Sequence, residues 1–140
     1  MDGHIVRSWL AKNPAGLNEI VRALLAAGRP LHLLAFLNDG IQDGQDVSWI
    51  YDADVERLAG HVARLTCAGT RADDLALRFH LAGRTPEATV AVTGPALDAA
   101  LAATPEGGTL DIVATYTAMI DVREVVAARA GAGAYWERAS

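Results

Sequence analysis

The residues whose side chains are best suited to chemistry lie in one acidic stretch, residues 38–48. Three aspartates, Asp39, Asp43 and Asp46, alternate there with glycine and amide side chains. The stretch follows an apolar run and is long for a connection in a compact domain, which is typical of functional loops. Asp and Asn side chains bond the backbone of their own turns, and we expect this role of Asp39 and Asp43. Asp46 differs in context, because it directly precedes the aromatic segment 47–51 after a predicted buried strand, at the end of an open α/β sheet where ligands and partners gather.

The same stretch does not fit a calcium-binding loop. If Asp39 were the first ligand, Ile41 would stand at the third position, where an oxygen ligand is needed. Ile50 would stand at the twelfth position, which requires a bidentate glutamate. Trp49 and Tyr51 are either core residues or anchors of an interface, where aromatic residues are enriched. The residue types alone leave both interpretations open.

No other pattern points to catalysis within a single chain. Cys67 ends an apolar run, so we expect a buried, inert thiol rather than a nucleophile. None of the four histidines pairs with another at the i,i+3 or i,i+4 spacing of a helical metal site, and we expect no metal site. The sequence also lacks the P-loop motif G-x-x-x-x-G-K-[ST], the dinucleotide fingerprint G-x-G-x-x-G and the nucleophile elbow G-x-S-x-G.

The composition predicts one globular domain. The chain has 140 residues, of which 51% are hydrophobic and 21% charged, which excludes a disordered chain and allows a sizeable core. The net charge of −5 argues against a nucleic-acid partner. The apolar runs are too short for a transmembrane segment, and we expect no signal peptide. The single cysteine excludes an internal disulfide, and we expect a cytoplasmic location.

Apolar runs of strand length alternate with segments of helical period. The runs predict strands at residues 5–11, 31–37, 62–67, 89–92 and 110–114. The periodic segments predict helices from Asn13-Pro14 to the Gly28 stop, within residues 49–58, from Thr70 to about 82, from Gly94-Pro95 to about 103, and from Thr115 or Thr117 to about 129. Asn13 and the threonines are the expected N-caps. The alternation predicts an α/β domain, a three-layer Rossmann-like fold with a mostly parallel sheet of about five or six strands.

Four stretches together resemble one family. They are residues 10–18, reading Leu-Ala-Lys-Asn-Pro-Ala-Gly-Leu-Asn; residues 37–39 with 43–54, the second of which reads Asp-Gly-Gln-Asp-Val-Ser-Trp-Ile-Tyr-Asp-Ala-Asp; residues 69–72; and residues 115–119. Over residues 3–130 the chain resembles the C-terminal domain of MurT, the Mur-ligase-like subunit of lipid II isoglutaminyl synthase. The resemblance implies a fold of the Mur ligase C-terminal type over residues 1–130, followed by a C-terminal tail over residues 131–140.

The resemblance implies a partner and a reaction. MurT pairs with GatD, a class I glutamine amidotransferase subunit that releases ammonia from glutamine. MurT uses ATP to activate the α-carboxylate of D-glutamate in the lipid II stem peptide, and ammonia then gives D-isoglutamine. In this family the nucleophilic Cys and the His lie on GatD, and MurT supplies the third member of the triad. That member corresponds to Asp46, so Asp46→Asn is expected to abolish ammonia release.

The resemblance also implies contacts for other residues. The candidates for the GatD interface lie close to Asp46 in the sequence, namely Asp43, Ser48, Trp49 and Tyr51. Lys12 and Asn13 stand where related Mur ligases carry a motif beside the nucleotide, so they are expected to face ATP. A simple helix cap explains Asn13 equally well. ATP and Mg²⁺ are expected to bind mainly to the central domain of the full-length subunit, and no cofactor is expected for this domain alone.

The chain carries neither the P-loop nor the zinc ribbon of the family's central domain, so we interpret it as an excised or truncated domain that is inactive alone. The full-length subunit would act on lipid II at the inner face of the cell membrane. Two alternatives stay open. One is a non-catalytic nucleotide-binding or regulatory Rossmann-like module. The other is a folate- or murein-type ligase domain that uses free ammonia or an amine and has no use for Asp46.

Overall fold

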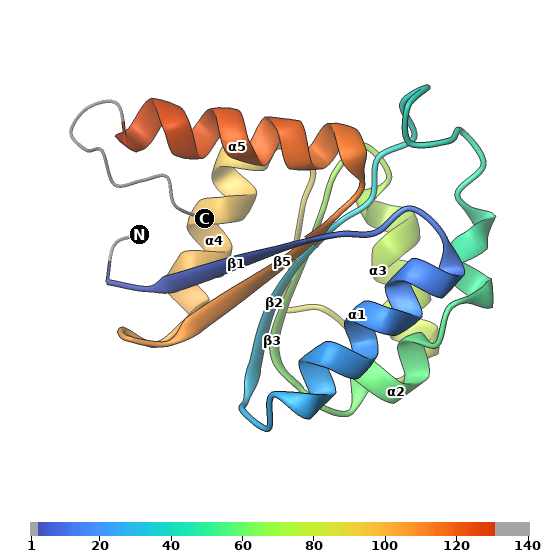
Figure 1. The fold of residues 1–140 in the computed structure, drawn as a ribbon, viewed down its shortest axis with the longest axis horizontal. Helices are drawn as coiled ribbons and strands as arrows, with labels where there is room; N and C mark the ends of the chain where they lie inside the picture. The colour runs from blue at the N-terminus through green and yellow to red at the C-terminus, as the bar shows by residue number, and fades with distance from the viewer. Residues whose placement is uncertain (1–2, 131–140) are drawn as a thin grey trace.

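The computed structural model describes residues 3–130 and shows a five-stranded sheet between two layers of helices (Figure 1). All strand pairs are parallel, and the strands lie in the order β1-β5-β2-β3-β4. Their bounds are β1 Ile5–Leu10, β2 Leu31–Phe36, β3 Val62–Ala68, β4 Ala88–Val90 and β5 Thr109–Ala114. The predicted three-layer α/β fold is confirmed. The expected tail, residues 131–140, lies outside the described residues.

The helices divide between the two faces of the sheet (Figure 1). One face carries α1 Pro14–Ala26, the 3-10 helix η1 Ser48–Asp52, α2 Val55–Ala59 and α3 Ala72–Leu81. The other face carries α4 Thr93–Ala103 and α5 Tyr116–Ala130. None of the helices within residues 3–130 is long and apolar enough to cross a membrane.

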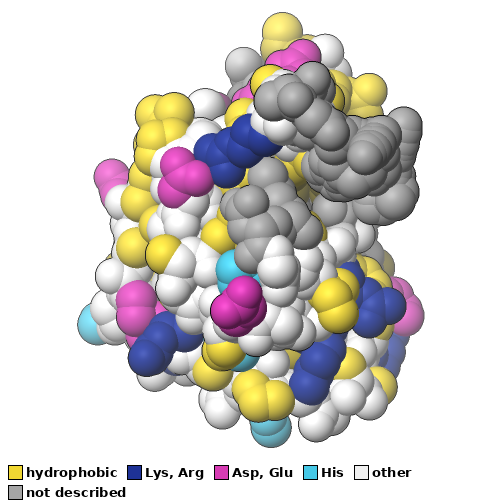
Figure 2. Space-filling model, turned by 90° about the vertical axis from the view of Figure 1, so that its left-hand side faces the viewer, with side chains coloured by type: hydrophobic (Ala, Val, Ile, Leu, Met, Phe, Trp, Pro, Cys, Tyr) yellow, Lys and Arg dark blue, Asp and Glu magenta, His cyan; other side chains and the backbone are white. Residues whose placement is uncertain are grey.

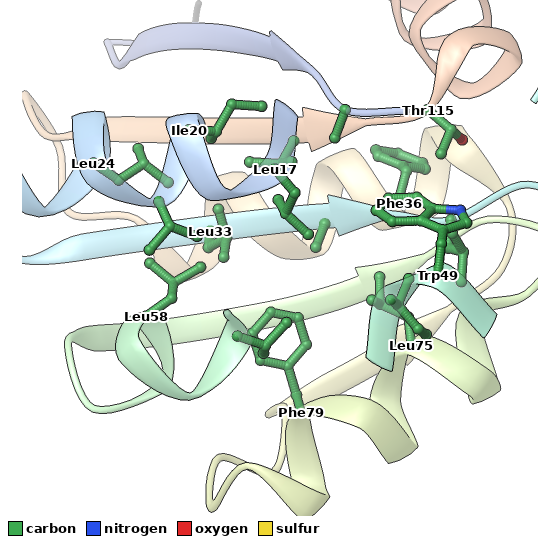
Figure 3. Close-up of a pocket in the computed structure, with 17 residues that line it drawn as sticks. Leu17, Ile20, Leu24, Leu33, Phe36, Trp49, Leu58, Leu75, Phe79 and Thr115 are labelled. Atoms are coloured by element: carbon green, nitrogen blue, oxygen red, sulfur yellow. The ribbon is translucent and has the colours of Figure 1, made fainter. Parts of the chain in front are cut away.

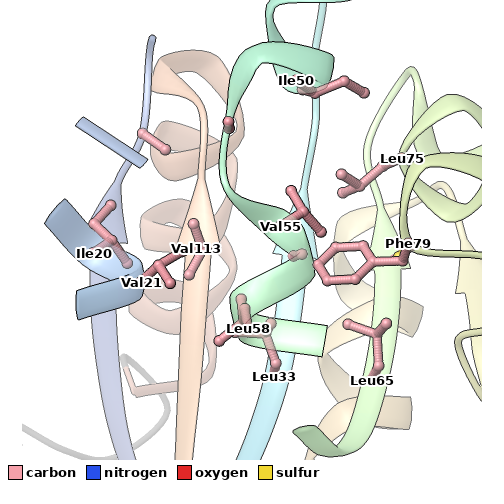
Figure 4. Packing of buried hydrophobic residues seen from close by; sticks show 14 of the residues in the cluster. Ile20, Val21, Leu33, Ile50, Val55, Leu58, Leu65, Leu75, Phe79 and Val113 are labelled. Carbon is pink, nitrogen blue, oxygen red and sulfur yellow. The ribbon is translucent and has the colours of Figure 1, made fainter. Parts of the chain in front are cut away.

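The central strand β2 is buried on both faces, as its nearly continuous apolar run predicts. Successive side chains of a strand point to opposite faces. Leu33 and Ala35 therefore pack with α1, α2 and α3, whereas Leu34 and Phe36 pack with α4 and α5. Figure 4 shows the first cluster, where side chains from α1, α2 and α3 converge on the sheet.

Two stretches differ from the sequence prediction. The helix expected within residues 49–58 consists of η1 and α2, separated at Ala53, whose backbone is extended. The fourth strand ends at Val90 rather than at residue 92, and α4 begins at Thr93, before the Gly94-Pro95 pair that the sequence suggests as its start. The proline still falls in the first turn of α4, where its missing N–H costs no helical hydrogen bond.

The helix caps also differ in part from the prediction. Asn13 caps α1 as predicted, because its side-chain oxygen accepts the Gly16 N–H at 2.7 Å. The prediction that Thr70 caps α3 is wrong. The Thr70 hydroxyl donates instead to the Asp39 carboxylate, and Arg71 stands at the N-cap of α3, where its side chain makes no capping hydrogen bond. The Thr70 Oγ1 atom also accepts the Asp39 N–H at 3.1 Å, so the oxygen that would cap the helix is bonded to the loop after β2 instead.

The five parallel strands bring their carboxyl ends to one edge of the sheet, where the acidic loop begins. Gly69 follows β3 with a φ of +102°, and a Cβ there would lie only 2.4 Å from the Leu37 carbonyl oxygen. Glycine alone permits both the backbone conformation and the close approach. The turn between β3 and α3 therefore lies directly against the residues that follow β2.

Candidate functional site

The base of the acidic loop is held by Asn38, which follows β2 and is 7% exposed. Its backbone N–H donates to Thr115 Oγ1 at 3.0 Å, and its Nδ2 donates to Thr117 Oγ1 at 2.9 Å. Its Oδ1 accepts the Thr70 N–H at 2.9 Å. Because β2 lies between β5 and β3, this one residue ties the loop to the turns that follow both neighbouring strands.

Asp39 adds a second link to the same turn. Its Oδ1 accepts the Thr70 hydroxyl at 3.0 Å, and its Oδ2 accepts Arg71 Nη1 at 3.3 Å. The Thr70 hydrogen bond first, and the Arg71 guanidinium after it, hold the pKa of Asp39 below its usual range. The Asp39 carboxylate therefore links two loops, whereas the prediction placed its hydrogen bonds within its own turn.

Asp43 fastens the middle of the loop to the start of α5. Its Oδ1 accepts the Thr117 N–H at 2.8 Å, and its Oδ2 accepts the Thr117 hydroxyl and, at 3.1 Å, the Gly40 N–H. The bond to Gly40 confirms the predicted turn role. The bond to the Thr117 N–H makes Asp43 a cap of α5, where the sequence suggests Thr115 or Thr117, and the helix dipole favours a carboxylate there. Asp43 is 8% exposed, and its contact with a partner stays a prediction.

Asp46 lies on the exposed part of the loop, which projects between β2 and η1 (Figure 1). Residues 44–46 are exposed, whereas Asp43 before them and Val47 after them are buried. Asp46 Oδ1 accepts the Ser48 N–H at 2.9 Å, and this bond holds the pKa of Asp46 below its usual range. A hydrogen bond from the Ser48 side chain lowers the pKa of Asp46 as well. The loop thus presents an exposed, ionised carboxylate whose hydrogen bonds within residues 3–130 come from its neighbour Ser48.

The aromatic segment after Asp46 divides between core and surface. Trp49 is half-buried and lines an apolar cavity of about 40 Å³ between the sheet and the helices α1 to α3 (Figure 3). Tyr51 is 50% exposed, and Ser48 is exposed. The two interpretations of the aromatic residues therefore apply to different residues: Trp49 packs in the core, while the ring of Tyr51 is available at the surface.

Arg78 of α3 is a residue that the sequence analysis misses. Its side chain is 4% exposed, and it donates to the carbonyl oxygens of Ile50 at 2.8 Å and Ala53 at 3.0 Å. It also donates to both carboxylate oxygens of Glu56, at 2.8 and 2.9 Å, and these bonds lower the pKa of Glu56 to about 2. The sequence could have indicated that Arg78 is buried, because Arg78 lies one turn after Leu75 on the apolar face of its helix.

Lys12 and Asn13 lie at the same edge of the sheet, directly after β1. The capping interpretation of Asn13 is confirmed, and a nucleotide contact by either residue stays a prediction. Within residues 3–130, no group of three or more His, Cys, Asp or Glu side chains is placed to hold a metal ion. Where ATP and Mg²⁺ bind stays a prediction, and Lys12 is exposed at this edge.

Within residues 3–130, Asp46 has no reactive cysteine and no histidine beside it. Cys67 is fully buried, and burial raises the pKa of its thiol to about 12, as expected of an inert cysteine. Every histidine of the chain lies toward the opposite edge of the sheet, where strands begin and α3 ends: His4, His32, His61 and His80. Figure 2 views the side where β1 begins and shows histidines among interspersed charges of both signs. Asp46 can therefore accept a hydrogen bond from another protein's imidazole but cannot pair with one in its own chain.

These features define the class of protein. A three-layer domain with an all-parallel sheet and a carboxylate-bearing loop at the carboxyl edge is a Rossmann-like α/β domain. The family model described as MurT ligase C-terminal matches residues 10–119. The chain therefore belongs to this family.

Curated relatives agree with the family match. The chain is 46% identical over 78 residues to the "Lipid II isoglutaminyl synthase (glutamine-hydrolyzing) subunit MurT" of Staphylococcus aureus. This match covers 52% of this chain and 17% of the relative. It is 31% identical over 121 residues to the protein of the same name from Streptococcus pneumoniae, which covers 86% of this chain and 27% of the relative. The chain thus corresponds to roughly a quarter or less of the length of these relatives.

Proposed function

We propose that the chain is the C-terminal domain of a MurT-type subunit of a glutamine-hydrolysing lipid II isoglutaminyl synthase. In this proposal it docks a GatD-type glutaminase and supplies Asp46 as the third member of that enzyme's Cys-His-Asp triad. The observation that carries the proposal is the placement of Asp46. Its carboxylate is exposed on a loop anchored at both ends and is bonded within residues 3–130 to its neighbour Ser48, and every histidine of the chain lies at the other edge of the sheet.

The chemistry of such a triad explains what Asp46 would contribute. The glutaminase Cys attacks the amide carbon of glutamine while the His takes the thiol proton and later delivers it to the leaving ammonia. A carboxylate that accepts the second N–H of the imidazole holds the productive tautomer and stabilises the imidazolium. The Ser48 N–H supports this role because it favours the ionised form of Asp46. Ammonia release would then begin only when the two proteins assemble.

The remaining steps belong to the full-length subunit. We propose that it binds ATP and Mg²⁺ mainly through its central domain, activates the D-glutamate α-carboxylate of lipid II, and works in the cytoplasm at the inner face of the cell membrane. Lys12 and Asn13 would face the nucleotide when the domains close. Tyr51, Ser48, Trp49 and Asp43 are the proposed contributors to the glutaminase interface; Tyr51 and Ser48 would touch the partner directly, since Trp49 and Asp43 are largely buried.

The test measures ammonia release from glutamine by a GatD-type glutaminase alone, with the chain, and with the Asp46→Asn variant. Asp52→Asn is the matched control, because Asp52 is exposed on η1 and makes no hydrogen bond or ion pair within the described residues. Activity should appear with the chain and with the control and should fall by about 10⁴-fold with Asp46→Asn, as in triads that lose their carboxylate. A binding measurement should show that both variants still dock.

Other outcomes would favour the alternatives. Equal ammonia release in all mixtures would remove Asp46 from catalysis and leave a ligase domain that uses free ammonia or an amine. Nucleotide binding by the chain without any affinity for the glutaminase would instead favour a nucleotide-binding or regulatory module. If the chain alone does not dock, the assay is repeated with the full-length subunit. This distinguishes a failure to dock from the loss of the triad carboxylate.

A further inference from the structure

Arg78 connects three elements at the carboxyl edge of the sheet. It projects from α3 and reaches the last part of η1 through the Ile50 carbonyl, the η1–α2 junction through the Ala53 carbonyl, and α2 through Glu56. Four hydrogen bonds from one guanidinium converge on residues 50–56, which begin four residues after Asp46. We propose that Arg78 is a positioning residue that fixes η1 and, through it, the Asp46 carboxylate.

The backbone of this segment needs such a partner. The carbonyl groups at the end of a short helix have no N–H donor within the helix, and burying them unpaired is unfavourable. Ile50 is 2% and Ala53 is 4% exposed, so water does not replace the missing donors. A guanidinium suits this place because its donors lie in a fixed planar fork, whereas a lysine would offer a point charge.

A short path leads from Arg78 to Asp46. Arg78 binds the Ile50 carbonyl, the Ile50 N–H donates to the Val47 carbonyl at 3.2 Å, and the Ser48 N–H in the same turn donates to Asp46 Oδ1. If η1 shifts, the Ser48 N–H moves away from Asp46. The carboxylate then loses both its orientation and the hydrogen bond that favours its ionised form.

The outer side of Arg78 is closed by two residues. The Arg78 Cζ atom lies 5.3 Å from the centre of the Tyr51 ring. The Glu56 carboxylate accepts a hydrogen bond from each terminal nitrogen atom of the guanidinium. Tyr51 therefore covers the guanidinium while half of its own surface faces outward. The same residue that is proposed to meet the glutaminase thus lies against the residue that positions Asp46.

The experiment compares Arg78→Met with Arg84→Met as a matched control. Arg84 makes the same kinds of bonds at the other edge of the sheet, to the Val62 carbonyl at 3.0 Å, the Ala63 carbonyl at 3.2 Å and the Glu87 carboxylate at 2.9 Å. Loss of a hydrogen-bonded arginine is therefore common to both variants, and only Arg78→Met removes a contact to η1.

The first measurement is an NMR titration of the Asp46 carboxyl carbon together with the Ser48 amide signal in the chain alone. In Arg78→Met the Ser48 signal should shift and the pKa of Asp46 should rise toward its ordinary value. Both should keep their wild-type values in Arg84→Met. Unchanged values in folded Arg78→Met would overturn the inference. If Arg78→Met does not fold, Arg78→Lys keeps the charge, loses the fork and should show the same changes at smaller size.

The second measurement is ammonia release by the glutaminase at a saturating concentration of the chain, and it rests on the function proposed above. Arg78→Met should lower kcat by about 10²-fold, as expected when a reacting group is displaced by about 1 Å, while the KM for glutamine stays unchanged. A lower kcat with an unaltered Asp46 titration would overturn the path through η1. If the titration changes but Asp46→Asn leaves ammonia release intact, the positioning by Arg78 holds and the proposed function fails.

Discussion

The two edges of the sheet use carboxylates in opposite ways. Toward the amino ends of the strands, Asp111 of β5 is completely buried and accepts hydrogen bonds from Arg29 at 2.7 and 3.3 Å and from Trp9 Nε1 at 3.0 Å. At the carboxyl edge, Asp46 is exposed and bonds its neighbour Ser48 among residues 3–130. An aspartate is a structural group where buried partners from other elements surround it and a candidate functional group where it is exposed and bonded to a neighbour in its own loop.

The difference extends to the residues around each carboxylate. At the carboxyl edge, Asn38, Asp43 and Arg78 are themselves buried, and their polar atoms hold the loop and η1 on either side of Asp46. At Asp111, Arg29 and Trp9 close over the carboxylate itself. A carboxylate can therefore be displayed without being mobile when other polar residues take over the structural hydrogen bonds. Asp46 makes local hydrogen bonds to Ser48 and none to another element within residues 3–130, so its substitution is expected to cost little stability.

The largest effect is expected from removing the buried carboxylate. Asp111→Ala leaves the Arg29 guanidinium without its partner in the protein, and breaking such a pair costs about 3–5 kcal/mol of unfolding free energy. Urea denaturation measures this loss, with exposed Asp121 changed to Ala as the control, for which less than about 0.5 kcal/mol is expected. Equal costs for both variants would contradict the contrast between the two edges.

A smaller effect is expected from the loop clamp. Asp43→Ala removes the carboxylate that caps α5 and should lower the unfolding free energy by about 1–2 kcal/mol, which denaturant unfolding detects. Hydrogen exchange at the Thr117 amide should rise in the same variant, because that donor loses its acceptor. If stability is unchanged and only the affinity for the glutaminase falls, Asp43 is an interface residue and not a clamp.

The smallest effect concerns pH. Arg78 lowers the pKa of Glu56 from 4.5 to about 2 in the folded chain, so the ionised form stabilises the fold at pH values above 4.5. This contribution is lost as the pH falls from 4.5 to 2, because the unfolded state takes up the proton first. It is modest because the Glu56 side chain is 59% exposed and solvent screens the pair.

Glu56→Gln should flatten this part of the dependence of stability on pH, measured by denaturant unfolding at several pH values between 2 and 6. Glu124→Gln is the control, since Glu124 is exposed on α5 and makes no hydrogen bond or ion pair within the described residues. An identical slope for wild type and Glu56→Gln would show that the ion pair with Arg78 contributes nothing to the acid sensitivity of the fold.

The prediction of the fold succeeded where one pattern dominates a segment. The apolar run at residues 31–37 identified the central strand β2, and Asn13 followed by Pro14 identified the start of α1. Both depend on interactions within a few residues or on burial of a whole segment. The prediction failed at Thr70, because its hydroxyl bonds Asp39, which is 31 residues away in the sequence. Local propensity contains no information about such an acceptor.

The candidate site shows the same limit. Residue types and position indicated a loop that carries aspartates after a buried strand, and the resemblance to the MurT family singled out Asp46. The role of Asp43 could not be derived in this way, since its partner Thr117 lies 74 residues further along the chain. Arg78 was missed because an arginine on a helix is usually solvated, and its position on the apolar face of α3 was the one available sign.

The sequence by itself determined the α/β class, the inertness of Cys67, the lack of a P-loop and the existence of the acidic loop, because these follow from composition, periodicity and short motifs. Only the tertiary structure decided which aspartates are used within the chain and which one is left exposed. The physical reason is that hydrogen bonds and burial depend on distances in space. The parallel sheet brings the ends of β5, β2 and β3 together, and that meeting gives Asn38, Asp39 and Asp43 their partners while Asp46 remains exposed.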